Sequence, residues 1–205
     1  MSGGNAARRP PEQNPAYKPW ELVFLLKNVN PVKMRRATHF YRFPPPNPPP
    51  PMHYWLMKSE PDVFGLAHLQ ARPGGVSPWD GVRNYQARNF LRDTMQPGDP
   101  VLFYHSSCEI PGVAGLAEVA GAARPDPTQF DPKSDFHDSG AKPENPRWWL
   151  VDVRYVATFP KFVPLTTLRA TPALRRCRLL ASGNRLSVFP VTAAEYKTIG
   201  KLGGV

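Results

Sequence analysis

Proline is concentrated in one part of this 205-residue chain, and its distribution limits where a packed domain can form. Of the 27 prolines, 12 lie in residues 1–51, and seven of those 12 occupy positions 44–51. Proline donates no backbone hydrogen bond and fixes its own φ, so such a run stays extended and joins neither a helix nor a central strand. The sequence therefore predicts a division near Met52, with a folded domain over 52–205.

The two parts also differ in charge. Residues 1–51 hold eight Lys or Arg and two Glu, a net charge of +6. Residues 52–205 hold eighteen Lys or Arg and fourteen Asp or Glu, a net charge of +4. Residues 1–19 are mostly Gly, Ala, Arg, Pro and Asn, a composition that buries too little apolar surface to fold. We expect 1–51 to be a disordered, basic, Pro-rich extension without a site of its own. A basic arm that binds nucleic-acid phosphates is one alternative, and a true translation start at Met52 is another.

Several function classes lack support in the sequence. At 41% apolar residues the chain can bury a core, but it contains no run of 18 apolar residues to cross a membrane. Cys108 and Cys177 form neither a disulfide framework nor a metal-ligand spacing. Phosphate-loop, dinucleotide-binding and zinc-peptidase motifs are absent, and His105 with Cys108 lacks the glycine signature of a nucleophile. We expect a monomer without metal, cofactor, catalytic residues or membrane partner, in the cytoplasm, or in the nucleus of a eukaryote.

Hydrophobic patterning predicts short strands separated by short helices. Strands are expected at 53–58, 101–105, 113–120, 148–159 and 186–191. Helices are expected at 66–71, at 84–95 with Asn84 as N-cap, and after Thr192, where Glu195 completes a capping box; 165–169 and 172–176 suit helical turns. Residues 121–147 are interpreted as a long loop. Five or six strands without a regular βαβ repeat indicate an α+β domain, a small mixed β-barrel or curved sheet.

The run from Trp79 to Leu91, WDGVRNYQARNFL, combines an aromatic ring, a turn signal and many hydrogen-bonding groups. An aromatic plane beside amide and guanidinium groups suits a flat, polar, anionic ligand such as a nucleotide base. Asp80-Gly81 predicts a turn, and Arg83 and Asn84 stand where the next helix begins, a position that favours anions. The alternatives are core packing for Trp79, a plain cap for Asn84 and a solvated helix face for the arginines.

Polar side chains also stand at the ends of predicted strands, where hydroxyl, imidazole and cationic groups can contact a base edge or a phosphate. In chain order these are Lys58 and Ser59, Tyr104, His105 and Ser106, and Arg185 and Ser187. The doublet Trp148-Trp149 sends one ring to each face of its strand, one into the core and one free to line a pocket. The basic residues Arg175, Arg176 and Arg178 are either a solvated turn or a phosphate contact.

Six blocks of the sequence resemble one protein family, in the same order. They are YWLMKSEP at 54–61, WDGVRNYQARNFLRD at 79–93, VLFYHSSC at 101–108, PGVAGLAEV at 111–119, WWLVDVRYV at 148–156 and RLSVFPVT at 185–192. The resemblance is to the EVE domain family and covers residues 52–205. It implies a PUA-like fold, with a small mixed β-barrel of five or six strands flanked by short helices.

The same resemblance implies a non-enzymatic module that takes a flipped, modified base of DNA or RNA, such as a modified cytosine, into a pocket between barrel and helices. The residues implied for that pocket are Lys58, Ser59, Trp79, Arg83, Asn84, Tyr85, Tyr104, His105, Ser106, Trp148, Asp152, Arg185 and Ser187. We expect the base to stack on Trp79 or Tyr104. Phosphate contacts are expected from Lys58, Arg83, Arg88, Arg175, Arg176 and Arg178.

Two other functions remain open at the level of sequence. The first is an enzyme that acts on a nucleobase or nucleotide in the same pocket, with His105 as general base and Asp152 orienting it. The second is a small-molecule or protein-interaction module in which the pocket is vestigial. The sequence decides neither which modification is bound nor whether the partner is DNA or RNA.

Overall fold

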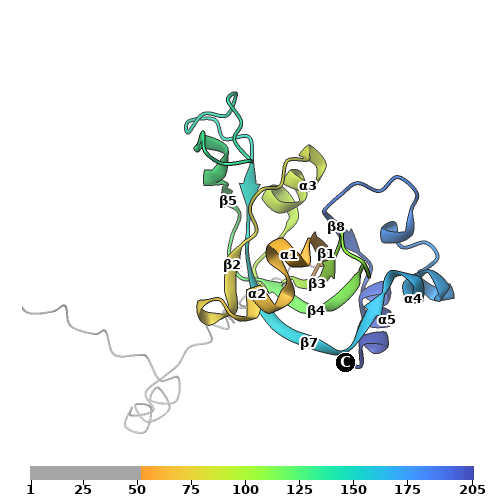
Figure 1. Cartoon of the computed structure of the whole chain (residues 1–205). Helices are drawn as coiled ribbons and strands as arrows, with labels where there is room; N and C mark the ends of the chain where they lie inside the picture. Colours follow the sequence, from red (N-terminus) through yellow and green to blue (C-terminus); the bar gives the residue numbers. More distant parts are fainter. Residues whose placement is uncertain (1–51) are drawn as a thin grey trace, which may run out of the picture. The chain divides into compact units, whose positions relative to one another are not determined.

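The structure, a computed structural model, describes residues 52–205 (Figure 1). The predictions made for 1–51, including the phosphate-binding arm and the alternative start at Met52, lie outside the described residues. Within 52–205 the chain forms one six-stranded sheet, one two-stranded sheet and a set of short helices. No helix in this range has the length and apolarity to cross a membrane.

The six-stranded sheet is mixed and strongly curved. Its strand order is β2-β7-β4-β3-β1-β8, in which β1 runs parallel to β3 and every other neighbouring pair is antiparallel. The strands are β1 (Tyr54–Ser59), β2 (Val76–Pro78), β3 (Pro100–His105), β4 (Gly112–Val119), β7 (Asp152–Pro164) and β8 (Val188–Val191). The predicted α+β class, with a small mixed barrel, is confirmed in the form of a half-barrel.

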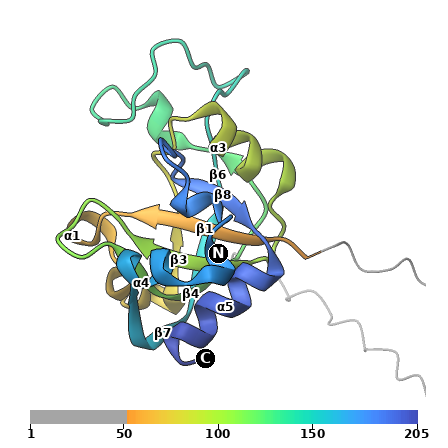
Figure 2. The same ribbon diagram turned by 90° about the vertical axis from the view of Figure 1, so that its right-hand side faces the viewer.

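Irregular pairing between β4 and β7 accounts for the curvature. The register of this pair shifts twice, between Val113 and Gly115 and between Leu116 and Ala117, and such bulges bend a strand. At Gly115 the two backbones approach so closely that a Cβ would lie 2.2 Å from the carbonyl oxygen of Ala157. Figure 2, turned by 90° from the first view, shows β7 passing below β3 and β4 toward the C-terminal helix.

One predicted strand is divided in the structure. The pattern over 148–159 predicts a single strand, but the chain forms β6 (Trp149–Leu150) and then β7. β6 pairs with β5 (Arg124–Pro125), whereas β7 pairs with β4 and β2, so the chain changes partners at Val151. The expected long loop 121–147 therefore contains β5 and a 3₁₀ turn at Pro127–Phe130. The alternation of apolar residues shows which side of the chain is buried. It continues without a break where the chain changes its partner strand, so it could not show the division.

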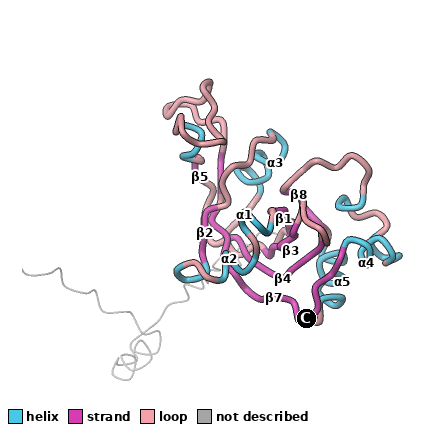
Figure 3. Tube along the Cα trace, viewed as in Figure 1, coloured by secondary structure: helices cyan, strands magenta, loops and turns pink. Residues whose placement is uncertain are grey.

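Short helices surround the half-barrel, as the tube in Figure 3 shows. They are α1 (Pro61–Phe64), α2 (Leu66–Gln70), α3 (Tyr85–Asn89), α4 (Leu165–Ala170) and α5 (Ala193–Gly203), with 3₁₀ turns at Pro73–Gly75, Pro172–Leu174 and Arg178–Leu180. The predicted caps are confirmed: Asn84 accepts hydrogen bonds from the backbone of Gln86 and Ala87, and Thr192 and Glu195 form a reciprocal capping box. The helix expected over 84–95 continues beyond α3 as a π-helical turn at Phe90–Thr94.

The core lies inside the curve of the sheet and under α5. Its largest fully buried side chains include Trp55 and Met57 of β1, Phe103 of β3 and Phe189 of β8. Apolar burial of this extent is the main source of stability in a domain of this size. Because β1 lies between β3 and β8, the packed core holds the ends of all three strands in place, and the polar residues that follow those ends form one wall of the site described next.

Candidate functional site

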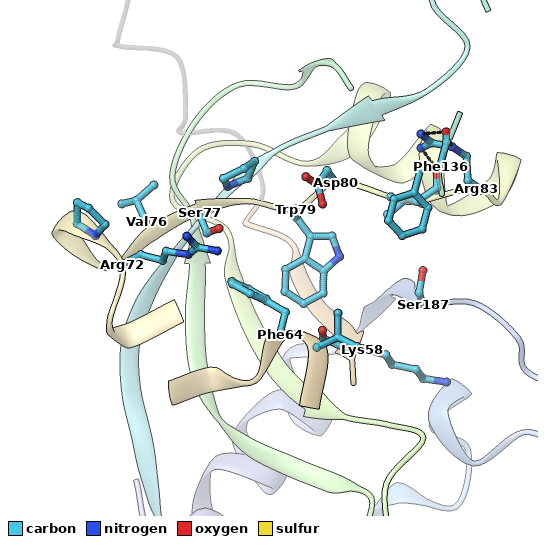
Figure 4. Close-up of a pocket in the computed structure, with 16 residues that line it drawn as sticks. Lys58, Phe64, Arg72, Val76, Ser77, Trp79, Asp80, Arg83, Phe136 and Ser187 are labelled. Atoms are coloured by element: carbon cyan, nitrogen blue, oxygen red, sulfur yellow. Dashed lines mark hydrogen bonds between the residues drawn. The ribbon is translucent and has the colours of Figure 1, made fainter. Parts of the chain in front are cut away.

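A cavity of about 620 Å³ lies where the segment from Arg72 to Arg83 crosses the end of β1 (Figure 4). Its other walls come from α1, from the residue preceding β8, and from the loop between β5 and β6. The lining residues are Lys58, Ser59, Val63, Phe64, Arg72, Pro73, Val76, Ser77, Pro78, Trp79, Asp80, Gly81, Val82, Arg83, Phe136 and Ser187. The cavity thus combines aromatic, cationic, anionic and hydroxyl groups from five separate parts of the chain.

Trp79 forms the aromatic floor of the cavity. Its indole packs edge-on against Phe103, with ring centroids 5.4 Å apart, and against Phe64, at 6.3 Å. The side chain is 7% exposed, and Figure 4 shows it between Phe64 and Asp80, with part of the ring directed into the cavity. Trp79 therefore packs in the core, one of the alternatives that the sequence offers for it, and at the same time lines the cavity.

Lys58 and Ser187 stand on the side of the cavity formed by β1. The backbone of Lys58 donates to the carbonyl of Ser187 at 2.8 Å, which brings the residue before β8 alongside β1. The ammonium of Lys58 lies 5.3 Å from the centre of the Phe189 ring, and burial lowers the pKa of Lys58. A cation in this position has few competing partners, so it is available to an anionic or electron-rich ligand.

Asp80 stands at the open edge of the cavity, directly after Trp79. Desolvation and the nearby carboxylate of Asp126 raise the pKa of Asp80, while a hydrogen bond from its own backbone N–H and the charges of Arg83 and Arg124 oppose this rise. Gly81 follows with φ of +72°, in the left-handed region that favours glycine. No turn is assigned at 79–84, so of the predicted Asp80-Gly81 turn the structure shows only this left-handed glycine.

Arg83 closes the cavity by binding the loop between β5 and β6. Its guanidinium donates to Asp126 Oδ2 at 2.8 Å, to Thr128 Oγ1 at 2.8 Å, and to the backbone carbonyls of Val82 and Phe136. Together these contacts use all five of its N–H groups. The structure therefore gives Arg83 a positioning role, and a phosphate would have to displace one of these bonds to reach it.

The Arg83 contacts place Phe136 over the site. The Arg83 guanidinium lies 5.5 Å from the centre of the Phe136 ring, and that ring contacts the backbone at Gly81. A Cβ built on Gly81 would lie 2.7 Å from the tip of the ring, so a larger residue there would have to displace Phe136 as well as adopt a positive φ. The loop interpreted from sequence as a connection therefore supplies an aromatic wall.

Tyr85 and Trp148 belong to a four-membered stack outside the cavity. Their rings are stacked with centroids 4.9 Å apart, the Arg88 guanidinium lies 4.9 Å from the Tyr85 ring, and that of Arg83 lies 5.4 Å from the Trp148 ring. Each ring thus has one aromatic and one cationic neighbour, and Tyr85 stays 56% exposed. Trp148 also donates from Nε1 to Asp138. These contacts fasten α3 to the loop, and both rings lie outside the cavity lining, contrary to the expectation from the sequence.

Of the thirteen residues expected in the base pocket, five line the cavity: Lys58, Ser59, Trp79, Arg83 and Ser187. The others lie outside the lining, for physical reasons that differ from residue to residue. Tyr104 is buried in the core. His105 Nε2 accepts a hydrogen bond from the Leu66 backbone at 3.1 Å, and the Ser106 backbone and hydroxyl bind the Ser59 carbonyl. These contacts close the end of β3 against β1 and α2.

Asp152 and His105, the pair considered for catalysis, have separate partners. Asp152 accepts from Arg124 at 2.6 Å at the start of β7, and His105 holds the beginning of α2. Burial, together with nearby His68, lowers the pKa of His105. Because the hydrogen bond from Leu66 occupies the lone pair that a general base would use, the geometry gives His105 a structural role.

A basic segment flanks the cavity beyond Ser187. Two hollows, of about 660 and 350 Å³, adjoin the loop 178–186; Arg169, Arg175 and Arg185 line the first, and Asn84, Arg178 and Arg185 line the second. Within 52–205, the guanidiniums of Arg169, Arg175, Arg176, Arg178 and Arg185 make no hydrogen bond or ion pair. By contrast, Arg88 donates to the Arg147 carbonyl and the Asn89 side chain. Asn84 and Arg185 therefore border these hollows and not the main cavity.

The sequence did not identify several residues that line the cavity. Phe64, Arg72, Phe136 and the three residues of β2, Val76–Pro78, come from segments that carry turn or loop signals. Asp80 was recognised only as part of a turn. The described residues contain no group of three or more His, Cys, Asp or Glu side chains able to hold a metal ion.

Comparison with known proteins places this architecture in a family. The family model described as the EVE domain matches residues 53–202. Human thymocyte nuclear protein 1 is 41% identical over 159 residues, which cover 70% of this chain and 70% of that protein. A crystal structure of a Pseudomonas putida protein is 50% identical and has a TM-score of 0.69, with 73% of this chain and 99% of that chain covered.

A further structure carries a ligand. The structure of human THYN1 protein in complex with 5-methylcytosine-containing DNA is 39% identical to this chain, with a TM-score of 0.71, and covers 75% of this chain and 98% of that one. The family model matches most of the chain, and these relatives are 39–50% identical to it over 70–75% of its length. The chain belongs to the EVE domain family.

Proposed function

We propose that this chain is a non-enzymatic reader of a modified cytosine in nucleic acid, and that it takes the flipped base into the cavity above Trp79. The observation that carries the proposal is a cavity of about 620 Å³ whose lining combines the aromatic residue Trp79 with Lys58, Ser59, Asp80 and Ser187. The related human protein in complex with 5-methylcytosine-containing DNA supports the choice of base and of DNA.

The size and chemistry of the cavity suit a single base. Volumes of 300–1,000 Å³ are usual for small-ligand sites, and a base buried there gains stacking and hydrogen bonds only after it leaves its duplex. In this proposal the base stacks on Trp79, and Ser59, Asp80 and Ser187 contact its polar edge. Tyr104, the other stacking residue considered, is enclosed in the core.

The segment 169–185 supports a second part of the proposal, contact with the phosphate backbone. The described residues 153–194 contain no Asp or Glu, whereas Arg169, Arg175, Arg176, Arg178 and Arg185 all lie there. Unpaired arginines near the mouth of a base pocket are suited to hold the strand on either side of the flipped nucleotide. Lys58 and this basic segment replace Arg83 and Arg88 as the proposed phosphate contacts, since those two are engaged within the protein.

Residues 52–205 are the proposed reading domain. A nuclear location is proposed for a eukaryotic source, because the matched human relative is named a nuclear protein. RNA binding, cytoplasmic location and the monomeric state stay predictions from the sequence.

Fluorescence anisotropy tests the proposal directly. Labelled duplexes identical except for one position, carrying 5-methylcytosine, cytosine or an abasic site, are titrated with the full chain at fixed salt, and matched RNA strands form a second series. We expect the 5-methylcytosine duplex to bind at least several-fold more tightly than the cytosine duplex. Equal affinity for all three duplexes contradicts base reading. Mass spectrometry of the recovered DNA tests the enzymatic alternative, and an altered base would favour it.

A further inference from the structure

We propose that Asp80 selects the base held in this cavity, by accepting a hydrogen bond from the 4-amino group of cytosine and rejecting the 4-carbonyl group of thymine and uracil. The inference rests on the proposed function, because it needs a base above Trp79. It goes beyond that function in naming the residue that distinguishes a cytosine from a thymine bearing the same methyl group.

The first support is the position of Asp80. Asp80 directly follows Trp79, the aromatic floor of the cavity. It is the only acidic residue among the sixteen that line the cavity. The backbone on both sides is anchored: the Trp79 N–H donates to the Val151 carbonyl at 2.9 Å, and the Gly81 N–H donates to Asp126 Oδ2 at 3.0 Å. The backbone of Asp80 is therefore held in place beside the position where a base would stack on Trp79.

The second support is the contrast between Asp80 and Asp126. Asp126 is 0% exposed and accepts hydrogen bonds from Gly81, Arg83 and Thr128. The Asp80 carboxylate, by comparison, is stabilised by a hydrogen bond from its own backbone N–H, and it makes no ion pair or side-chain hydrogen bond with another residue in 52–205. The two arginines that act on Asp80 are engaged elsewhere: Arg83 is bound to Asp126 and Arg124 to Asp152. Asp80 thus keeps acceptor capacity at the edge of the cavity, whereas the nearby Asp126 is satisfied within the protein.

The third support is the chemistry of the bases. Cytosine carries an amino group at position 4, which donates hydrogen bonds, and acidic side chains pair with it for that reason. Thymine and uracil carry a carbonyl oxygen at the same position, which would face the carboxylate with a second acceptor. Sites that hydrogen-bond one ligand group reject the analogue lacking it far more strongly than apolar pockets reject a missing methyl group. A carboxylate at this edge therefore discriminates by repulsion as well as by attraction.

The test compares 5-methylcytosine with thymine. Both bases carry a methyl group at position 5 and differ at position 4 and the adjacent ring nitrogen. Each is placed opposite an abasic residue in otherwise identical duplexes, so that no partner base has to be broken away. We expect the wild-type chain to bind 5-methylcytosine at least tenfold more tightly than thymine.

Two variants give this comparison its meaning. Asp80→Asn keeps the size of the side chain but offers both a donor and an acceptor, so we expect the ratio between the two bases to fall to within about threefold. Asp62→Asn, on the exposed face of α1 and outside the cavity lining, makes the same change of charge and should keep the ratio. Loss of a negative charge alone would strengthen DNA binding in both variants. We expect Asp80→Asn to weaken 5-methylcytosine binding instead, by about tenfold.

The outcomes separate the inference from the proposed function. If wild type does not prefer 5-methylcytosine to cytosine, the proposed function fails. If it has that preference but binds thymine equally well, or if Asp80→Asn keeps the tenfold ratio, the assignment of Asp80 is wrong and the reader function stands. Should Asp80→Asn fail to fold, the wild-type ratio and the Asp80→Glu variant, in which the carboxylate is displaced by one methylene, still decide the point.

Discussion

The guanidinium of Arg83 and the carboxylate of Asp126 meet at 2.8 Å across 43 positions of sequence, and this pair fastens the loop between β5 and β6 to the edge of the cavity. Asp126 also accepts from the backbone of Gly81 and from Thr128, so one carboxylate organises three segments. Together with the bonds from Arg83 to Thr128 and to the Phe136 carbonyl, this ion pair holds the loop and Phe136 at the cavity.

Removing this carboxylate should destabilise the domain. Asp126→Ala leaves the largely buried Arg83 guanidinium without its partner, and breaking a buried pair in this way costs about 3 kcal/mol or more. Urea unfolding of the wild type and the variant measures the difference. Asp93→Ala, which breaks the solvent-exposed Arg92–Asp93 pair, is the control and should leave the unfolding midpoint unchanged. A similar midpoint for Asp126→Ala and wild type would contradict the role assigned to the pair.

The same carboxylate predicts an acid-sensitive stability. Burial by itself would raise the pKa of Asp126, but the hydrogen bonds from Arg83, Thr128 and Gly81 outweigh it and the pKa is lowered. A lowered pKa stabilises the folded state above the ordinary Asp value of about 3.9. That contribution is lost as pH falls from there through the lowered pKa. Unfolding free energies measured from pH 6 to pH 2 should therefore fall less steeply for Asp126→Ala than for wild type.

Gly81 should tolerate alanine poorly. Its φ of +72° costs an L-residue about 1–2 kcal/mol, and the new Cβ would lie 2.7 Å from the Phe136 ring. Gly183→Ala is the matched control, because Gly183 has the same φ and nothing within 4 Å of a Cβ. We expect thermal unfolding to show a larger loss for Gly81→Ala than for Gly183→Ala. Equal losses would mean that Phe136 moves aside freely.

Trp79 should dominate the affinity for the base. Loss of one stacking partner costs about 1–3 kcal/mol, so Trp79→Leu should weaken binding of the 5-methylcytosine duplex by about 5- to 150-fold. Leucine is preferred to alanine because truncation of a core aromatic costs about 3–5 kcal/mol of stability. Tyr85→Leu is the comparison: Tyr85 is 56% exposed and stacked on Trp148, and it lies outside the cavity lining. A larger loss for Tyr85→Leu would place the stacked base on the outer rings.

The basic segment should determine the salt dependence of binding. Arg175→Gln combined with Arg178→Gln removes two unpaired cations, and each lost phosphate contact lowers the slope of log affinity against log salt by about 0.9. Arg154→Gln, whose guanidinium is paired with Glu118, should leave the slope almost unchanged. The measurement is anisotropy at several salt concentrations. An unchanged slope in the double variant would exclude these arginines from the DNA contact.

The two thiols should differ in reactivity. Desolvation raises the pKa of Cys177 to about 11, and the residue is buried, whereas Cys108 is partly exposed. Because the thiolate is the reactive form, a thiol reagent at pH 8 should modify Cys108 first and Cys177 only after unfolding. Peptide mass spectrometry of the labelled native protein distinguishes the two. Rapid labelling of Cys177 in the folded chain would contradict its burial.

Short-range signals in the sequence were sufficient for much of the framework. Asn84 and the Thr192–Glu195 pair satisfy backbone groups within one helical turn, so their roles could be predicted locally. The strand at β1 and the buried face of β7 follow from apolar patterning. The six ordered blocks were enough to identify the family, because each block combines residue types that core patterning alone does not require.

The site depended on contacts between distant segments. Local patterning could not show that β2 forms, since three residues ending in proline carry almost no strand signal and gain their hydrogen bonds from β7. It also could not show that Arg83 binds Asp126 and Phe136, or that Tyr85 and Trp148 cover one another, because these partners lie 43 to 63 positions apart.

The sequence by itself thus determined the family, the α+β class with a small mixed barrel and the helix caps, and it named Trp79, Lys58 and Ser187, which line one cavity in the structure. Only the tertiary structure decided which polar groups remain free. Arg83, His105 and Asp152 have the chemistry of ligand-binding residues, but each is bound to a partner within the protein. Asp80 carries only a turn signal in the sequence, and at the cavity edge it makes no ion pair or side-chain hydrogen bond with another described residue. The physical reason is that hydrogen-bond satisfaction is a property of the folded surroundings, and residue type reveals only the capacity for it.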